Sequence, residues 1–366
     1  SDIDMPTAIT QIAGRKVAAE KIPSWWEIEK IWYPKHLSLE QCSSEITARY
    51  KARLLQGDSL TDLTGGFGID CSFLATGFKS ATYVERQEEL CEIAAHNFPV
   101  LNLNHINIKN EDGVTYLQAM SPVDCLFLDP ARRNEHGGKT VAISDCEPNV
   151  AELEELLLQK ANRVMIKLSP MLDLSLALKE LKQTQEVHIL SVNNECKELL
   201  ILLGQTSPAE ISIHCVNLFT KGTQKEQHFV FTREQEQCSE CTYTDSLETY
   251  LYEPNASLLK AGAFRSIAAA YPVRKLHPNS HLYTSDTFIE NFPGRIFRIV
   301  NQCSFNKKEV KENLADLKKA NVTVRNFPAT VAELRKRIHL AEGGDTYLFA
   351  STLNNGQKVL IRCEKV

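Results

Sequence analysis

The sequence contains no apolar run long enough to cross a lipid bilayer, and it shows no leader with a basic start and an apolar centre. Its 366 residues are 43% hydrophobic and 24% charged, a composition typical of folded globular proteins. A chain of this length is expected to form two or three domains. We therefore expect a cytoplasmic protein without membrane contact. Because the chain starts with Ser1, we expect its natural N-terminus to lie upstream.

The eleven cysteines lack the spacing of a disulfide framework, and several fall inside predicted strands or helices. This pattern is typical of reduced, buried thiols in a cytosolic protein. The Cys-x-x-Cys from Cys238 to Cys241 is followed by no second pair and no His-x-His. Two thiols in a polar loop are therefore favoured over half a zinc site, and we expect no metal.

Residues 60–68, Leu-Thr-Asp-Leu-Thr-Gly-Gly-Phe-Gly, predict a short buried strand that ends in a glycine turn before a helix. Glycines at such a turn let backbone N–H groups approach a ligand closely. Two phosphate-binding fingerprints are absent, since Cys71 replaces the third glycine of a dinucleotide turn and Gly-Lys-Ser/Thr does not occur. The carboxylate of Asp62, just before the turn, suits a cationic ligand.

Acidic residues follow each of the next predicted strands. Glu85 lies twenty residues after Gly65, where an acid binds the ribose diol in a nucleotide-binding βαβ unit. Glu111-Asp112-Gly113 comes at the next strand end, and Asp129-Pro130-Ala131-Arg132 at the one after it. Ligands of open α/β sheets bind outside the carboxyl ends of the strands. We therefore expect these side chains to face one cleft.

This order of features resembles a class I S-adenosylmethionine (SAM)-dependent methyltransferase. The resemblance implies that the glycine turn binds the methionine part of SAM, Glu85 the ribose and Asp112 the adenine amine. The implied cofactor residues are Asp62, Thr64, Gly65, Gly66, Gly68, Glu85, Arg86, Asp112 and Gly113. The implied catalytic residues at the acceptor are Asp129, Pro130 and Arg132. The alternative, that Asp62 and Asp112 cap turns or helices, stays open.

The acceptor motif is similar to the Asn/Asp-Pro-Pro-aromatic motif of exocyclic-amine methyltransferases, and closest to RNA guanine-N2 and trimethylguanosine synthase-type relatives. Ala131 and Arg132 stand where those enzymes have a second proline and a stacking aromatic. Arg132 would then either stack on a base or bind a phosphate. The polar loop 133–147 that follows is expected either to close over a substrate nucleotide or to be a plain surface loop.

A pyrimidine-carbon methyltransferase needs a thiolate after the fifth strand, where this chain has Lys167-Leu-Ser-Pro170. Cys146 lies in a different loop, so a covalent mechanism is not expected. Lys167 is expected either to touch a phosphate or to close the sheet edge.

Alternating strands and helices from 57 to about 204 predict an α/β fold, a Rossmann-like seven-stranded methyltransferase sheet. The last two strands are joined by only Asn193–Lys197, too short for a crossover, so the final strand should be antiparallel. We expect a helical N-terminal segment (1–56), the methyltransferase domain (57–205), an α/β connecting region (206–289) and a small α+β domain (290–366). A helix is predicted over 38–55, with Ser38 and Gln41 forming a capping box.

The C-terminal residues 290–366 hold 14 Lys/Arg and 8 Asp/Glu, a net charge of +6, while residues 1–289 hold 27 and 38, a net charge of −11. Tyr252–Asn255, Arg325–Phe327 and Glu342–Asp345 resemble the THUMP-like domain that follows the methyltransferase domain in similar bacterial proteins. THUMP domains bind RNA, so the resemblance implies an RNA partner and methylation of an RNA base amine. A methyltransferase for a small molecule or protein, and a non-catalytic SAM- or RNA-binding protein, stay open.

Overall fold

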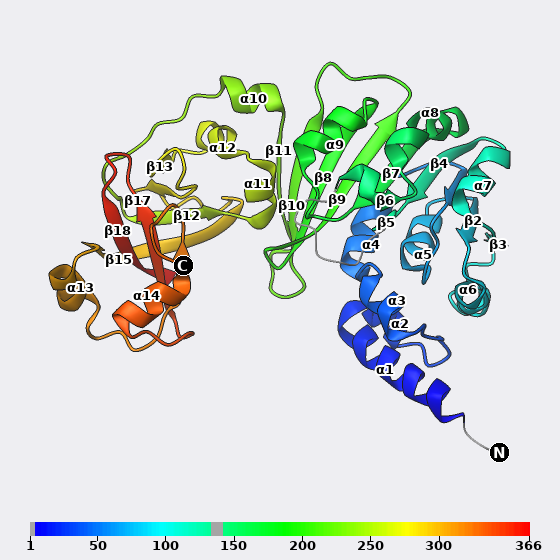
Figure 1. Cartoon of the computed structure of the whole chain (residues 1–366), viewed down its shortest axis with the longest axis horizontal. Coiled ribbons are helices and arrows are strands. Elements are labelled where there is room, and N and C mark those ends of the chain that lie inside the picture. The colour runs from blue at the N-terminus through cyan, green and yellow to red at the C-terminus, as the bar shows by residue number, and fades with distance from the viewer. Residues whose placement is uncertain (1–3, 133–141) are drawn as a thin grey trace. The chain divides into compact units, whose positions relative to one another are not determined.

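A computed structural model describes residues 4–132 and 142–366 of the chain (Figure 1). The polar loop 133–147 was predicted either to close over a substrate nucleotide or to be a plain surface loop, and its residues 133–141 lie outside the described residues. The chain divides into two compact units, residues 1–192 with 197–212, and residues 193–196 with 213–366. Within the described ranges, no helix is both long and apolar enough to span a membrane.

The N-terminal segment forms four helices: α1 (Met5–Lys21), α2 (Pro23–Trp26), α3 (His36–Gln41) and α4 (Glu45–Ala52). The single helix predicted over 38–55 is wrong, because Cys42 and Ser44 have extended backbones and separate α3 from α4. Lys35, not Ser38, precedes the first turn of α3, so the predicted capping box is also wrong. Ser43, between the two helices, is instead bonded to Asp70 and Lys51, contacts that a local pattern does not encode.

The first unit contains a sheet with the strand order β8-β9-β7-β4-β1-β2-β3. In chain order these strands are β1 (Ser59–Asp62), β2 (Ser80–Glu85), β3 (Ile106–Asn110), β4 (Val123–Leu128), β7 (Ala161–Leu168), β8 (Thr184–Val192) and β9 (Glu195–Gly204). Strands β1, β2, β3, β4 and β7 run parallel to one another. Strand β9 runs antiparallel to β7, as predicted. Asn193 and Asn194 have positive φ and form the tight turn before β9.

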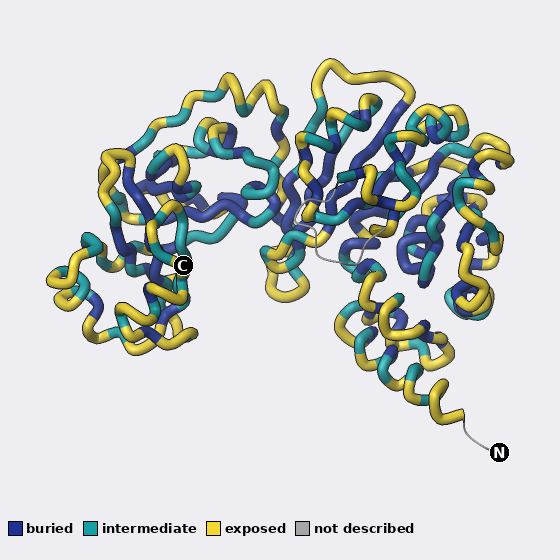
Figure 2. Tube along the Cα trace, viewed as in Figure 1, coloured by how far each residue is buried: buried dark blue, intermediate teal, exposed yellow. Residues whose placement is uncertain are grey.

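Helices follow the strands of this sheet in alternation: α5 (Ile69–Ala75), α6 (Glu88–Val100), α7 (Gly113–Ala119), α8 (Val150–Lys160) and α9 (Leu174–Glu180). A 3-10 turn (Ile143–Asp145) and the short pair β5 (Ala131–Arg132) and β6 (Cys146–Glu147) lie between β4 and α8. The sheet is the buried centre of the unit, dark blue in Figure 2, and Leu199–Leu203 of β9 have no exposed surface. A rigid sheet of this kind fixes where its strand ends lie.

The second unit includes an antiparallel hairpin formed by β10 (Ser212–Leu218) and β11 (Glu226–Phe231). Further on, a sheet has the order β13-β14-β12-β15-β18-β17-β16. Its strands are β12 (Tyr250–Pro254), β13 (Arg274–Lys275), β14 (Tyr283–Ser285), β15 (Gly294–Ser304), β16 (Asn321–Val324), β17 (Thr346–Thr352) and β18 (Lys358–Lys365). Helices α10 (Arg233–Cys238), α11 (Ala256–Ala261), α12 (Phe264–Ala270), α13 (Lys307–Leu314) and α14 (Val331–Ile338) complete the unit.

Strand β12 pairs with β15, so this sheet is continuous across the predicted boundary at residue 290. Helices α13 and α14 cover one face of it, because Leu314 and Leu334 pack with Leu348 and Leu360 in one apolar cluster. Side chains that alternate with these along the strands, such as Phe349 and Ile361, belong to a separate cluster on the other face. The division into four segments stays a prediction.

Candidate active site

A pocket of about 1450 Å³ lies in the first unit, where β1, β2, β4 and β7 end. It is lined by all twelve residues predicted to bind the cofactor or to act on the acceptor. These residues come from turns spread over 71 positions of the chain, from Asp62 to Arg132. The parallel sheet brings them together because its strands end at one edge. Their individual roles stay predictions.

The glycine turn after β1 is shaped by two different constraints. Gly66 and Gly68 have φ of 55° and 91°, the left-handed region that favours glycine. Gly65 has no room for a side chain, since a Cβ there would lie 2.3 Å from the ring of Tyr83. A Cβ on Gly66 would meet nothing nearer than 3.8 Å. The turn therefore packs tightly against the Tyr83 ring at Gly65, and it leaves free space beside Gly66.

Asp62 is buried at the end of β1, and its Oδ1 accepts a hydrogen bond from the Thr64 backbone N–H at 2.9 Å. Burial raises the pKa of this carboxyl well above its usual value, and the nearby acids Asp70, Asp129 and Glu85 add to the rise. A cationic group in the pocket would stabilise the ionised carboxylate. The turn-capping interpretation of Asp62 is confirmed by the contact with Thr64, and it does not exclude contact with a cation.

Glu85 connects the end of β2 to the glycine turn. Its Oε2 accepts from the Gly66 N–H at 2.8 Å, and its Oε1 accepts from the Gln87 N–H at 2.9 Å. Each carboxylate oxygen has a second lone pair, so both can still accept a ligand hydroxyl. Arg86, the next residue, is exposed, and its Nη1 lies 3.7 Å from Oε1 of Glu147, which also lines the pocket.

Asp112 is the N-cap of α7, and its Oδ2 accepts from the Thr115 backbone N–H at 3.0 Å. Asp112 therefore caps a helix, and its predicted contact with the adenine amine stays a prediction. Both hydrogen bonds that described residues make to this carboxylate use Oδ2, which leaves Oδ1 for a ligand in the pocket. Gly113 is required by packing, because a Cβ there would lie 2.3 Å from the Leu63 carbonyl oxygen.

Asp129 follows β4 and is tied to the glycine turn by its backbone. Its N–H donates to Thr64 Oγ1 at 2.7 Å. Its Oδ2 lies 2.8 Å from Lys167 Nζ, with side-chain exposures of 36% for Asp129 and 12% for Lys167. The ion pair was not predicted. Leu128 pairs with Ile166 in the sheet, so the register already places the next residues, Asp129 and Lys167, side by side.

Burial raises the pKa of the Asp129 carboxyl, while the adjacent Lys167 ammonium opposes that rise. Burial alone would lower the pKa of Lys167, but Asp129, Glu198 and Asp70 outweigh it and raise that pKa. Lys167 therefore stays protonated. Its charge favours the ionised form of Asp129.

Arg132 lies on β5, and its Nη2 donates to Ser169 Oγ at 2.5 Å. The aromatic residues among the described pocket lining, Phe67 and Phe127, are buried in the core. Neither belongs to the acceptor motif, so the two predicted roles of Arg132, stacking on a base or binding a phosphate, stay predictions. Pro130 is buried beside it.

The thiol that lines the pocket among described residues is Cys42, and burial raises its pKa to about 11. It is therefore protonated near neutral pH and a weak nucleophile. Cys146 is buried on β6 and does not line the pocket. These positions agree with a reaction without a covalent thiol adduct.

A cluster that the sequence did not reveal lies beneath the pocket. Lys51 Nζ is 2.7 Å from Asp70 Oδ1, 2.9 Å from Glu198 Oε2 and 2.7 Å from Ser43 Oγ. Ser43 Oγ also donates to Asp70 Oδ2 at 2.7 Å. Lys51 has no exposed surface, and the two carboxylates are almost as deeply buried. Ser43 and Asp70 line the pocket, so the cluster forms part of its floor.

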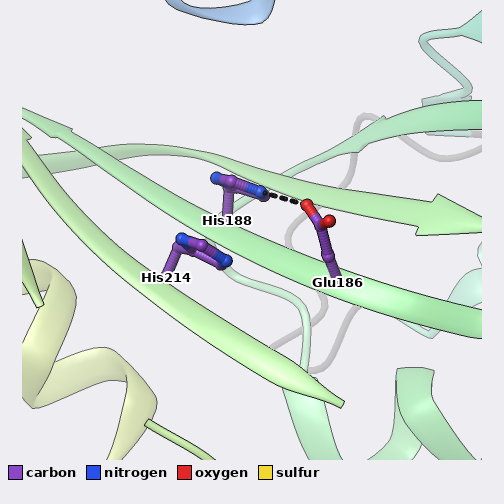
Figure 3. A group of neighbouring side chains, drawn as sticks. All are labelled: Glu186, His188 and His214. Carbon is purple, nitrogen blue, oxygen red and sulfur yellow. Dashed lines mark hydrogen bonds and ion pairs between the residues drawn. The ribbon is translucent and has the colours of Figure 1, made fainter. Parts of the chain in front are cut away.

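Glu186 and His188 of β8 lie outside the pocket lining. Figure 3 shows these two side chains joined by a hydrogen bond, with His214 beside them. His188 Nε2 is 3.0 Å from Glu186 Oε2, and its Nδ1 is 2.7 Å from the Tyr50 hydroxyl. The buried imidazole of His188 thus joins the sheet to α4 through Tyr50, the residue before Lys51.

The solved structure of a putative methyltransferase from Porphyromonas gingivalis W83 matches 100% of this chain and 92% of its own, with 36% identity and a TM-score of 0.90. This chain belongs to the same family. The predicted class I methyltransferase fold is confirmed by that match and by the strand order. In the present chain, residues 250–293 match the model of a ferredoxin-like domain, and residues 294–365 match a THUMP domain-like model. The second match confirms the predicted THUMP-like domain.

Two more distant solved structures are each similar to less than half of the chain. A putative methyltransferase from Streptococcus mutans in complex with SAH has 15% identity, with 44% of this chain and 96% of its own covered and a TM-score of 0.33. An rRNA methylase from Streptococcus thermophilus has 14% identity, 43% and 93% coverage and a TM-score of 0.31. No curated protein matches the chain. The family assignment therefore rests on the Porphyromonas structure.

Proposed function

We propose that this protein is a SAM-dependent methyltransferase that acts on an exocyclic amine of an RNA base, with guanine N2 as the first candidate. The observation that carries the proposal is the hydrogen bond from the Asp129 backbone N–H to Thr64 Oγ1 at 2.7 Å. It anchors the backbone of the acceptor-side Asp129 to the glycine turn of the same pocket. A base amine and a methyl donor bound there would be neighbours.

The residues present fit SAM. The turn is open above Gly66, Glu85 retains accepting lone pairs for a ribose diol, and Asp112 Oδ1 can accept from an adenine amine. Buried acids such as Asp62 suit a ligand that carries positive charge. When bound, SAM would supply a methyl group on a sulfonium.

Asp129 is proposed to bind and orient the acceptor. The lone pair of a base amine is delocalised into the ring, which makes the amine a weak nucleophile. A carboxylate that accepts its N–H hydrogen returns electron density to nitrogen and holds the lone pair in line for attack. The same carboxylate can take the proton that nitrogen releases. Lys167 occupies Oδ2, so Oδ1 remains for the amine.

An RNA substrate is supported by the second unit. Residues 294–365 match a THUMP domain-like model, and residues 290–366 carry a net charge of +6. Exposed cations lie on and beside the two helices that cover one sheet face: Lys307, Lys308, Lys311, Lys318, Lys319, Lys336 and Arg337. Such charges bind phosphate backbones without reading sequence.

Mass spectrometry of nucleosides from total RNA of a deletion strain and its parent tests the proposal. We expect one methylated purine nucleoside to be missing from the deletion strain and restored by the wild-type gene but not by Asp129→Ala. The purified protein should transfer labelled methyl groups from SAM to RNA of the deletion strain, and not to parental RNA. Unchanged RNA nucleosides, with SAM binding intact, would instead favour a small-molecule or protein acceptor.

A further inference from the structure

A buried lysine, a partly buried lysine and three carboxylates lie at the floor of the pocket. Lys51 contacts Asp70 and Glu198, while Lys167 contacts Asp129. All three carboxylates nevertheless act on Lys167 and raise its pKa. The sheet explains this proximity, because Lys167 of β7 pairs with Leu200 of β9, two residues from Glu198. Lys167 would therefore be shared among the carboxylates if Lys51 carried no charge.

Lys51 also holds one wall of the pocket. Its ammonium donates to Ser43, which lies in the link between α3 and α4. Lining residues of this wall are Leu37, Ser38, Gln41, Cys42 and Ser43. Because Ser43 donates in turn to Asp70, one ammonium fixes the wall to the start of α5. Loss of that ammonium would loosen the wall and change the charge of the floor together.

We propose that Lys51 is a positioning residue for the acceptor site, which holds Asp70 and Glu198 so that Lys167 stays paired with Asp129. The inference rests on the proposed role of Asp129 in methyl transfer. Lys51 has no exposed surface and does not line the pocket, so it does not touch a substrate bound there. Its position 147 residues before Glu198 makes the coupling a product of the tertiary fold.

The coupling predicts a shift in the pH dependence of turnover. The charged groups that act on Asp129 are Lys167 of β7, Asp70 of α5 and Lys51 of α4, and Asp62 of β1 interacts with it as well. Without Lys51, the positive charge of Lys167 is divided among three carboxylates. Asp129 then binds a proton more readily, and the acidic limb of the kcat profile should move up by about one pH unit.

The variants to compare are Lys51→Met and the double variant Lys51→Met/Glu198→Gln. The wild-type cluster of Lys51, Asp70 and Glu198 has one positive and two negative charges. The double variant has one negative charge and none positive, so the net charge of −1 is restored. The matched control is Lys160→Met, because the Lys160 ammonium of the same unit bonds to the Met120 carbonyl oxygen and is not part of the cluster.

We expect Lys51→Met to displace the acidic limb and to lower kcat by up to about tenfold at pH values on that limb, while the double variant returns the limb to its wild-type position. Lys160→Met should leave the limb in place. A folded Lys51→Met with a wild-type limb overturns the inference, and so does a folded double variant whose limb stays displaced. If Lys51→Met does not fold, a displaced limb in the double variant still overturns the inference, and a wild-type limb in the folded double variant supports it.

A measurement without turnover separates this inference from the proposed function. In protein with ¹³C-labelled aspartate, the Asp129 carboxyl signal is identified by its loss in Asp129→Asn, and its titration gives the pKa directly. An upward shift in Lys51→Met supports the positioning role even if RNA is not the substrate. No shift, in a protein whose Asp129→Asn variant is inactive, refutes the role of Lys51 and leaves the proposed function intact.

Discussion

Replacement of Asp129 should abolish methyl transfer without loss of cofactor binding. The Asp129 Oδ2 lies 2.8 Å from Lys167 Nζ, so an asparagine must turn its carbonyl oxygen toward that ammonium to avoid placing two donors together. Its amide NH₂ then faces the acceptor amine, which also donates. We therefore expect Asp129→Asn to be little better than Asp129→Ala. Both should lower kcat by about 10² to 10⁴, or roughly 2.7 to 5.5 kcal/mol of transition-state stabilisation.

The assay is transfer of labelled methyl groups to RNA from the deletion strain, with SAM affinity measured by calorimetry. Affinity should change by less than about threefold, or roughly 0.7 kcal/mol, because Asp129 faces the acceptor. Asp124→Asn is the matched control. Asp124 lies in β4, the strand that precedes Asp129, and its Oδ2 accepts from the backbone N–H groups of Asp58 and Ser59, which do not line the pocket. An Asp129→Ala variant with wild-type kcat would refute the reasoning. An inactive Cys146→Ser beside it would move the acceptor to a pyrimidine carbon.

Three further predictions concern the cofactor, the stability and the RNA interaction. Glu85→Gln should weaken SAM binding measured by calorimetry by about 1.5 to 3 kcal/mol, because a charged acceptor of the ribose diol is lost; unchanged affinity would contradict that role. The raised pKa of Asp62 means that the folded state holds a proton that the unfolded state releases, so stability falls as pH rises. Asp62→Asn should therefore melt higher at pH 7, by roughly 2 to 4 °C, and lose this advantage below about pH 4; an equal advantage at both pH values would be inconsistent with it. Changing Lys307, Lys308 and Lys311 to Gln should weaken RNA binding at low salt and reduce the log–log salt slope by about one for each phosphate group that is no longer neutralised, with SAM affinity as the control.

The RNA experiment uses substitutions because the sheet of the second unit does not permit a simple truncation. Strand β15 pairs with β12 on one side and β18 on the other. Removing residues 290–366 would therefore leave β12 with an unpaired edge and expose apolar residues such as Leu251, which packs against Phe297 and Phe349. Loss of RNA binding in such a fragment would not distinguish missing charges from unfolding.

Local patterns determined most of the first unit. The turn residues 65–68 and the acids at 62, 85, 112 and 129 were predicted to share a cleft because parallel strands end at one edge of a sheet, and the pocket lining brings them together. The antiparallel direction of β9 followed from a connection too short for a crossover. These features depend on periodicity and on loop length, which are properties of short stretches of chain.

Only the tertiary structure decided which charges pair. Lys167 had two candidate roles in the sequence, and its partner proved to be Asp129, 38 residues away. In the sequence, Lys51 is only one basic residue of a predicted helix. In the structure, it forms ion pairs with Asp70 and Glu198. A buried ion pair depends on strand register and on helix packing, and neither is encoded within a local window. The sequence alone therefore determined where the site lies, and the packing of α4 against the sheet decided how its charges are held.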